Sequence, residues 1–139
     1  MNKPIVFLDI DGVARPNTKP NNYKINEKNA SLLNKAFSLI NADVVISSNW
    51  RLIYPVSFFN THFDGRVIGM TRDLAYKNHL EYTRWHEILD YMSAHSGRSF
   101  CILDDQSEHF PLRANQLILC DGEIGFDMKK NNELVIKFK

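Results

Sequence analysis

The chain is poor in the features that mark secreted and membrane proteins. Only two of its 139 residues are cysteine, Cys101 and Cys120, and both lie in apolar runs. Such a pair predicts buried thiols of a reducing compartment rather than a disulfide framework. No apolar run approaches the ~18 residues of a membrane-spanning helix, and the first residues lack the apolar region of a signal peptide. We therefore expect a cytoplasmic protein with no membrane partner.

The chain also has little excess of charge of either sign. The chain has 17 Lys and Arg against 16 Asp and Glu, a formal net charge of +1, and no tract of either sign. This balance gives no indication of a strongly basic surface for nucleic acid. Hydrophobic residues make up 44% of the chain and charged residues 24%, which is typical of a globular protein. A chain of this length can build a substantial core without staples, so we expect residues 1–139 to form a single domain.

What the sequence does contain is a series of short, continuous apolar runs rich in β-branched residues. Such runs are typical of strands buried on both faces of a parallel sheet. They cover residues 5–8, 42–46, 100–103 and 116–119, with 67–70 as a candidate fifth strand. Helical spacing of apolar residues fills 26–41 and 83–95, with Thr83 as a candidate N-cap, and we favour a helix over a strand for 129–139. Alternating strands and helices predict an α/β fold with a mostly parallel sheet.

Polar side chains stand at the ends of three of these predicted strands. The first run is followed by Asp9 and Asp11, the second by Ser47, Ser48 and Asn49, and the third by Asp104 and Asp105. Ligands of open parallel sheets bind outside the carboxyl ends of the strands. The sequence therefore predicts that these side chains meet at one edge of the sheet and form a site there.

Several carboxylates in one place need a counter-cation. Two carboxylates ~4 Å apart repel by roughly 4 kcal/mol at an effective dielectric constant of about 20. The expected ligands are hard oxygens with no histidine or cysteine cluster, which favours Mg²⁺. A bound Mg²⁺ can hold a phosphate, and an aspartate beside it can attack phosphorus to form an aspartyl phosphate.

These motifs resemble those of the haloacid dehalogenase (HAD) superfamily of phosphatases. "FLDIDGV" is similar to the first motif, "VVISSNW" to the second and "CILDDQ" to the fourth. The third motif is normally a Lys or Arg, and here Arg84 is the best candidate, with Lys77 as the alternative. More narrowly, the series "SSNWR", "VIGMT", "RWHEI", "ILDD" and "DGEIGFD" resembles the small HAD domains of the Swiss-army-knife RNA-repair group.

The resemblance implies a fold, an activity and a role for each matched residue. The fold would be a Rossmann-like HAD domain with no large cap domain, and the activity a Mg²⁺-dependent phosphomonoester hydrolase. Asp9 would be the nucleophile, Asp11 the general acid and then base, Ser47 a hydrogen-bond donor to the phosphoryl group, and Arg84 a stabiliser of its charge.

The metal site implied by the resemblance consists of acids from the first and fourth motifs. Asp9, the backbone carbonyl of Asp11, and Asp104 would ligate Mg²⁺, with Asp105 as a second ligand or an orienting group. Asn49 and Arg51, next to the second motif, are the candidates for substrate binding.

The sequence does not identify the substrate. The resemblance points to phosphate ends on nucleic acid, and side chains that could contact such a strand are Arg15, Lys19, Arg51, Arg72, Trp50 and Tyr54. Trp50 fits packing and substrate contact equally well. A metabolite or nucleotide phosphatase of the same fold is the alternative, and a HAD module that binds phosphate without catalysis is another. The sequence does not indicate an oligomeric state.

Other proteins also carry paired acids after a strand. A calcium loop needs a downstream Glu at fixed spacing, which is missing here. A glycosyltransferase with a metal-binding DxD motif would leave "ILDD" unexplained, and a phosphoacceptor receiver module has its acidic pair on the first strand rather than a late one. The ordered set of motifs favours the phosphatase over all three.

Overall fold

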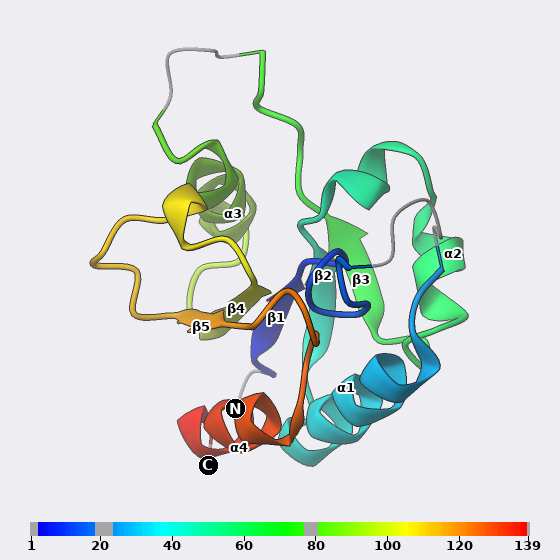
Figure 1. The fold of residues 1–139 in the computed structure, drawn as a ribbon. Helices are drawn as coiled ribbons and strands as arrows, with labels where there is room; N and C mark the ends of the chain where they lie inside the picture. Colours follow the sequence, from blue (N-terminus) through cyan, green and yellow to red (C-terminus); the bar gives the residue numbers. More distant parts are fainter. Residues whose placement is uncertain (1–2, 19–23, 77–80, 139) are drawn as a thin grey trace.

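A computed structural model describes residues 3–18, 24–76 and 81–138 of the chain. Its centre is a five-stranded parallel sheet with the order β3-β2-β1-β4-β5 (Figure 1). The strands are β1 (Ile5–Leu8), β2 (Asp43–Ile46), β3 (Val67–Met70), β4 (Phe100–Asp104) and β5 (Leu117–Leu119). Each predicted run forms a strand, so the predicted α/β fold with a parallel sheet is confirmed.

Helices connect these strands and cover the sheet. Among the described residues they are α1 (Glu27–Ile40), α2 (Val56–Asn60), α3 (Thr83–Ser93), α4 (Met128–Lys137), and the 3₁₀ turns η1 (Asn49–Leu52) and η2 (Ser107–His109). The predicted C-terminal helix is confirmed by α4. The prediction of Thr83 as an N-cap is wrong, because Thr83 is already helical and Tyr82 precedes it in a left-handed conformation with φ of 55°.

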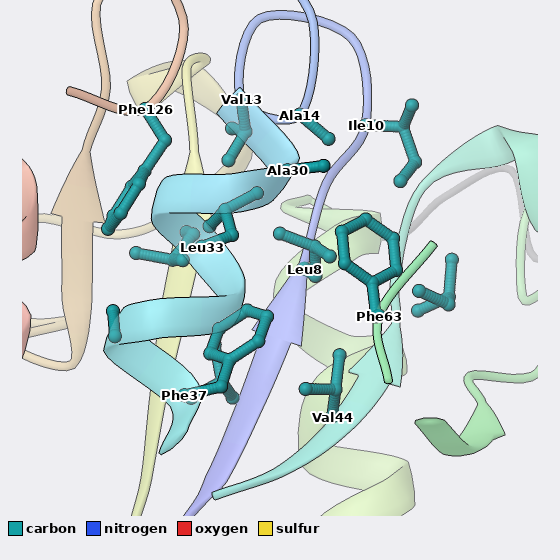
Figure 2. Close-up of a cluster of buried hydrophobic side chains, with 14 of the residues drawn as sticks. Leu8, Ile10, Val13, Ala14, Ala30, Leu33, Phe37, Val44, Phe63 and Phe126 are labelled. Carbon is teal, nitrogen blue, oxygen red and sulfur yellow. The ribbon is translucent and has the colours of Figure 1, made fainter. Parts of the chain in front are cut away.

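One face of the sheet packs against α1 and α4. Alternate strand residues point to opposite faces, and Leu8 and Val44 point to this one. Figure 2 shows Leu33 and Phe37 of α1 packed toward these two side chains. All four side chains are fully buried, and at about 25 cal/mol per Å² of apolar surface this layer supplies much of the stability that holds the strand ends in place.

The opposite face packs against α3. Phe7 of β1 lies here with Ile102 of β4, and Trp85 and Ile88 of α3 cover them. The sheet is thus the middle of three layers, with α1 and α4 on one side and α3 on the other (Figure 1). Because β1 is covered on both faces, its four residues are all apolar, as the continuous run "IVFL" predicted.

The chain order creates a switch point between β1 and β4. From β1 the chain continues to β2 and β3 on one side, and then returns to β4 and β5 on the other. In the sheet register Leu8 pairs with both Ile46 and Leu103. The next residues along these three strands therefore emerge side by side, and they are Asp9, Ser47 and Asp104.

Within the described residues no separate domain lies over this edge of the sheet. Residues 49–70 form η1, α2 and β3, and these pack on the same domain rather than forming a cap. This agrees with the expectation of no large cap. None of the helices described is both long and apolar enough to cross a membrane.

Candidate active site

Three carboxylates cluster at the switch point. Asp9, Asp104 and Asp105 each offer one oxygen, and these oxygens all lie within 4.8 Å of one another. At that separation each charged pair repels by about 3 kcal/mol with an effective dielectric constant of about 20. Asp9 and Asp104 are buried and Asp105 is half-buried, so water screens this repulsion poorly. The three acids form a site that a metal ion can occupy.

The protonation of these acids reflects the same crowding. Burial, followed by repulsion from Asp104, raises the pKa of Asp9 well above that of an ordinary aspartate. Burial also raises the pKa values of Asp104 and Asp105. In addition, Oδ1 of Asp105 is buried without a hydrogen-bond partner in the described structure. Buried carboxylates with raised pKa values and an unbonded oxygen suit a hard divalent cation, which prefers oxygen ligands.

Two glycines make room for the Asp105 carboxylate. A Cβ on Gly12 would lie 2.2 Å from Oδ2 of Asp105, and one on Gly122 would lie 2.4 Å from the same atom. Gly12 also has φ of 83°, which side-chain-bearing residues rarely adopt. Asn17 Nδ2 donates to Oδ2 of Asp105 at 2.9 Å. Gly12 thus follows Asp11 because any larger residue would displace the fourth-motif acid.

Arg84 faces the acids from α3. Its Nη1 lies 3.6 Å from Oδ1 of Asp9 and 3.4 Å from Oδ2 of Asp104. Its Nη2 donates to Oδ1 of Asn49 at 3.4 Å. The alternative residue for the third motif, Lys77, lies outside the described residues. A guanidinium at this distance from both acids can bind a phosphoryl group that sits between them.

Sequence reasoning missed Glu87, which holds Arg84 in place. Glu87 is buried, and its Oε1 lies 3.8 Å from Nε of Arg84. Its Oε2 lies 2.9 Å from Nη2 of Arg51 and accepts the amide of Leu74 at 3.0 Å. The spacing of three residues from Arg84 on one helix was the available signal, since residues i and i+3 are neighbours on a helix.

The segment "SSNWR" sends consecutive side chains to different parts of the site. Ser47 is fully buried, and its Oγ has no hydrogen-bond partner in the described structure, so this hydroxyl has unused hydrogen-bonding capacity at the end of β2. Ser48 Oγ accepts the Trp50 amide at 3.1 Å and caps η1. Asn49 meets Arg84, and with Leu52 it lines a hollow of about 240 Å³ beside that arginine.

Arg51 takes a supporting position instead of the predicted position at the substrate. Its side chain is only 2% exposed. All five of its N–H groups are used: Nε donates to the Thr71 carbonyl, Nη1 to the carbonyls of Ser47 and Ser48, and Nη2 to the Arg72 carbonyl and Glu87. We therefore correct the sequence-based expectation, because Arg51 ties the ends of β2 and β3 to α3 and has no N–H left for a phosphate.

Arg51→Met should destabilise the protein strongly. The change leaves Glu87 buried with one arginine fewer, and breaking a buried ion pair typically costs about 3–5 kcal/mol. Urea unfolding followed by circular dichroism measures the loss. Arg72→Met is the matched control, since Arg72 is exposed and pairs with Asp90 at the surface. Equal stabilities of the two variants would contradict the assigned role of Arg51.

Asp11 lies apart from the three clustered acids. Trp50 Nε1 donates to its Oδ2 at 3.1 Å, and Arg15 Nη1 lies 2.8 Å from its Oδ1. Trp50 is 5% exposed, and its ring packs against Tyr54 and Phe58, so it has no open face for a nucleic-acid base. Trp50 therefore packs in the core and donates a hydrogen bond to Asp11.

The other predicted substrate contacts have mixed positions. Arg15 is buried beside Asp11, and Tyr54 is half-buried and stacked on Phe58 with a ring separation of 4.1 Å. Arg72 is exposed and bonds Asp90. Lys19 lies outside the described residues. None of the described members of this set stands free beside the acids with an unused charge.

Comparison with protein families shows which family the chain resembles. The family described as "HAD domain in Swiss Army Knife RNA repair proteins" matches residues 5–130. This range runs from β1 into α4 and contains the acidic cluster, Ser47 and Arg84. Neither the curated proteins nor the solved structures gave a match.

Proposed function

We propose that this chain, since it belongs to the family of HAD domains in Swiss Army Knife RNA repair proteins, is a Mg²⁺-dependent phosphomonoester hydrolase with Asp9 as its nucleophile. One observation carries the proposal. Three carboxylates, a guanidinium and an unbonded serine hydroxyl converge at the switch point of a parallel sheet. Phosphoryl transfer depends on this combination of positioning and charge neutralisation.

The acidic cluster fits Mg²⁺ in the chemistry of its donors. Asp9, Asp104 and Asp105 offer hard carboxylate oxygens, and the buried Oδ1 of Asp105 lacks another partner in the described structure. These residues would hold the ion, which would neutralise the acids and draw in the phosphoryl oxygens of the substrate.

The first step forms the covalent intermediate. A carboxylate oxygen of Asp9 attacks phosphorus, and the bond from phosphorus to the leaving oxygen breaks with its electron pair on that oxygen. The leaving oxygen takes a proton from Asp11, because an alkoxide leaves poorly. Arg84, 3.6 Å from Asp9, stabilises charge on the phosphoryl group, and Ser47 Oγ donates a hydrogen bond to it.

The second step releases phosphate. Water attacks the phosphorus of the aspartyl phosphate, and Asp11, now a carboxylate, takes the proton of that water. The bond between phosphorus and Asp9 breaks, so both acids return to their starting states. Asp11 thus serves as acid in one step and base in the next.

A panel of phosphate esters with and without metal tests the proposal. We expect turnover of an aryl phosphate that disappears with EDTA and returns with excess Mg²⁺, because without a cation the acids repel one another and the substrate. Circular dichroism in EDTA serves as the control that the fold persists. Full turnover by metal-free wild-type protein would contradict a Mg²⁺-dependent mechanism.

The substrate class is proposed from the family description and the open site. Without a cap among the described residues, a terminal phosphate on a large molecule can reach Asp9. We expect kcat/KM for 3′- or 5′-phosphorylated RNA oligonucleotides to exceed that for mononucleotides and to fall as salt rises. Higher kcat/KM for mononucleotides or sugar phosphates, unaffected by salt, would favour a metabolite phosphatase instead.

A further inference from the structure

We infer that Trp50 and Arg15 are positioning residues that hold the Asp11 carboxylate where it exchanges protons with the leaving oxygen and with water. The inference rests on the proposed function, in which Asp11 is the acid and base. It assigns a catalytic purpose to two buried side chains that lie outside the acidic cluster.

The backbone of Asp11 is already fixed by its loop. The amides of Val13, Ala14 and Arg15 all donate to the Ile10 carbonyl, at 2.9 to 3.2 Å. Val13 and Ala14 are fully buried, which anchors the loop on the core (Figure 2). The position of the Asp11 Cα is therefore set by the fold before any side chain acts on the carboxylate.

The Asp11 side chain, by contrast, depends on other groups for its orientation. It is 52% exposed, and an exposed aspartate exchanges among rotamers unless its oxygens are bonded. Here each oxygen has its own donor: Arg15 Nη1 lies 2.8 Å from Oδ1, and Trp50 Nε1 lies 3.1 Å from Oδ2. One donor comes from the loop after β1 and the other from η1 after β2, so the carboxylate is held from two sides.

Both donors suit an acid that must give and take protons. An indole N–H only donates, and a guanidinium stays protonated, so neither group competes with Asp11 for the transferred proton. Each carboxylate oxygen has two lone pairs, and one donor leaves the other lone pair for that proton. Trp50 and Arg15 can therefore hold the carboxylate through both catalytic steps.

Trp50 is itself held rigidly. Its amide donates to Ser48 Oγ at 3.1 Å, and its ring centroid lies 5.6 Å from that of Tyr54 and 6.3 Å from that of Phe58. Its indole N–H therefore has a fixed direction. Trp50 is only 5% exposed, so its contact with Asp11 comes from a buried, well-packed side chain rather than from a loose surface residue.

A comparison of two leaving groups separates a loss of Asp11 positioning from a general loss of activity. A nitrophenolate leaves without protonation, whereas an alkoxide needs the proton of Asp11. For both esters kcat/KM reports the steps up to departure of the leaving group. In Trp50→Phe, which keeps an aromatic ring but loses the N–H, we expect kcat/KM for an alkyl phosphate to fall about 10- to 100-fold. For nitrophenyl phosphate we expect a change of less than about threefold, on the same reasoning.

Three further variants complete the test. Trp85→Phe is the matched control, since Trp85 is an equally buried indole, 7% exposed, that packs on Phe110 away from Asp11; it should change both esters equally. Arg15→Met should repeat the selective loss on the alkyl ester, and Arg15→Lys should restore part of it. Arg15→Met therefore carries the test even where Trp50→Phe folds poorly.

The possible outcomes separate failure of this inference from failure of the proposed function on which it rests. Wild-type activity with an unchanged ratio of alkyl to aryl kcat/KM in both Trp50→Phe and Arg15→Met overturns the inference alone. Wild-type protein inactive on every phosphate ester overturns the proposed function, and the inference with it. A selective loss on the alkyl ester in these two variants, and not in Trp85→Phe, supports the inference.

Discussion

Replacement of Asp9 by Asn should lower phosphatase kcat by about 10⁴-fold or more, because removing a nucleophile from a cooperating set of groups costs this much in other enzymes. The amide has nearly the same shape as the carboxylate but cannot attack phosphorus. Since Asp9 is buried among other acids, losing its charge should leave the fold intact. Steady-state hydrolysis of an aryl phosphate, with circular dichroism of the same sample, measures both effects.

The matched control for this variant is Asp64→Asn. Asp64 is exposed in the turn between α2 and β3 and has φ of 55°, a conformation that asparagine adopts readily. It should retain wild-type kcat. Wild-type rates in Asp9→Asn itself would remove Asp9 from the role of nucleophile.

Asp104→Asn should remove most Mg²⁺ binding and, at the same time, make the metal-free protein more stable at neutral pH. The carboxylates of Asp9, Asp104 and Asp105 repel one another, and the variant removes two of these repulsions. We expect a gain of about 1 kcal/mol or more in the free energy of unfolding, given roughly 3 kcal/mol per charged pair before Arg84 offsets part of it. Greater stability with lost function is a known trade-off at sites of this kind.

The pH dependence of this effect follows from the raised pKa values. Because the pKa of Asp104 is higher in the folded than in the unfolded protein, the folded state binds its proton more tightly. The contribution of Asp104 to the stability of the metal-free wild-type protein is therefore fully present below the ordinary pKa of aspartate, and it is lost as pH rises through the raised value. In Asp104→Asn this loss should be smaller.

Urea unfolding at several pH values measures the free energy of unfolding, and thermal unfolding with and without Mg²⁺ measures Tm. Mg²⁺ should raise the Tm of the wild-type protein, because it binds the folded state, and should leave the Tm of Asp104→Asn nearly unchanged. Asp43→Asn is the control, since Asp43 pairs with Arg98 at the opposite end of the sheet. An equal rise of Tm with Mg²⁺ in Asp104→Asn would place the metal elsewhere.

The strands and the meeting of Asp9, Ser47 and Asp104 could be predicted from the sequence for a physical reason. Strands buried on both faces are written as continuous apolar runs, and parallel strands bring their carboxyl ends to one edge. The residue that ends each run is then a neighbour of the other two in the folded sheet, as the register shows.

The partners of these residues could not be predicted in the same way. Arg51 and Arg84 look alike in the sequence, but the carbonyls at the end of β3 and Glu87 engage Arg51, while Arg84 faces the acids. Likewise, nothing in the spacing of Asp11 and Trp50 indicates that they share a hydrogen bond. Such contacts depend on the packing of elements that are distant in the chain, which apolar periodicity does not encode.

Direct detection of a phosphoryl group on Asp9 is the sharpest test of the account. Asp11→Asn should accumulate the intermediate from an aryl phosphate, because the leaving group needs no acid and hydrolysis lacks its base. The protein is mixed with the ester and Mg²⁺, quenched in acid and digested, and the peptide that contains Asp9 is examined by mass spectrometry. We predict a phosphoryl group on Asp9 that needs Mg²⁺ to form and that hydroxylamine removes. Turnover with no phosphoryl group on Asp9, or with one on another residue, would contradict the proposed mechanism.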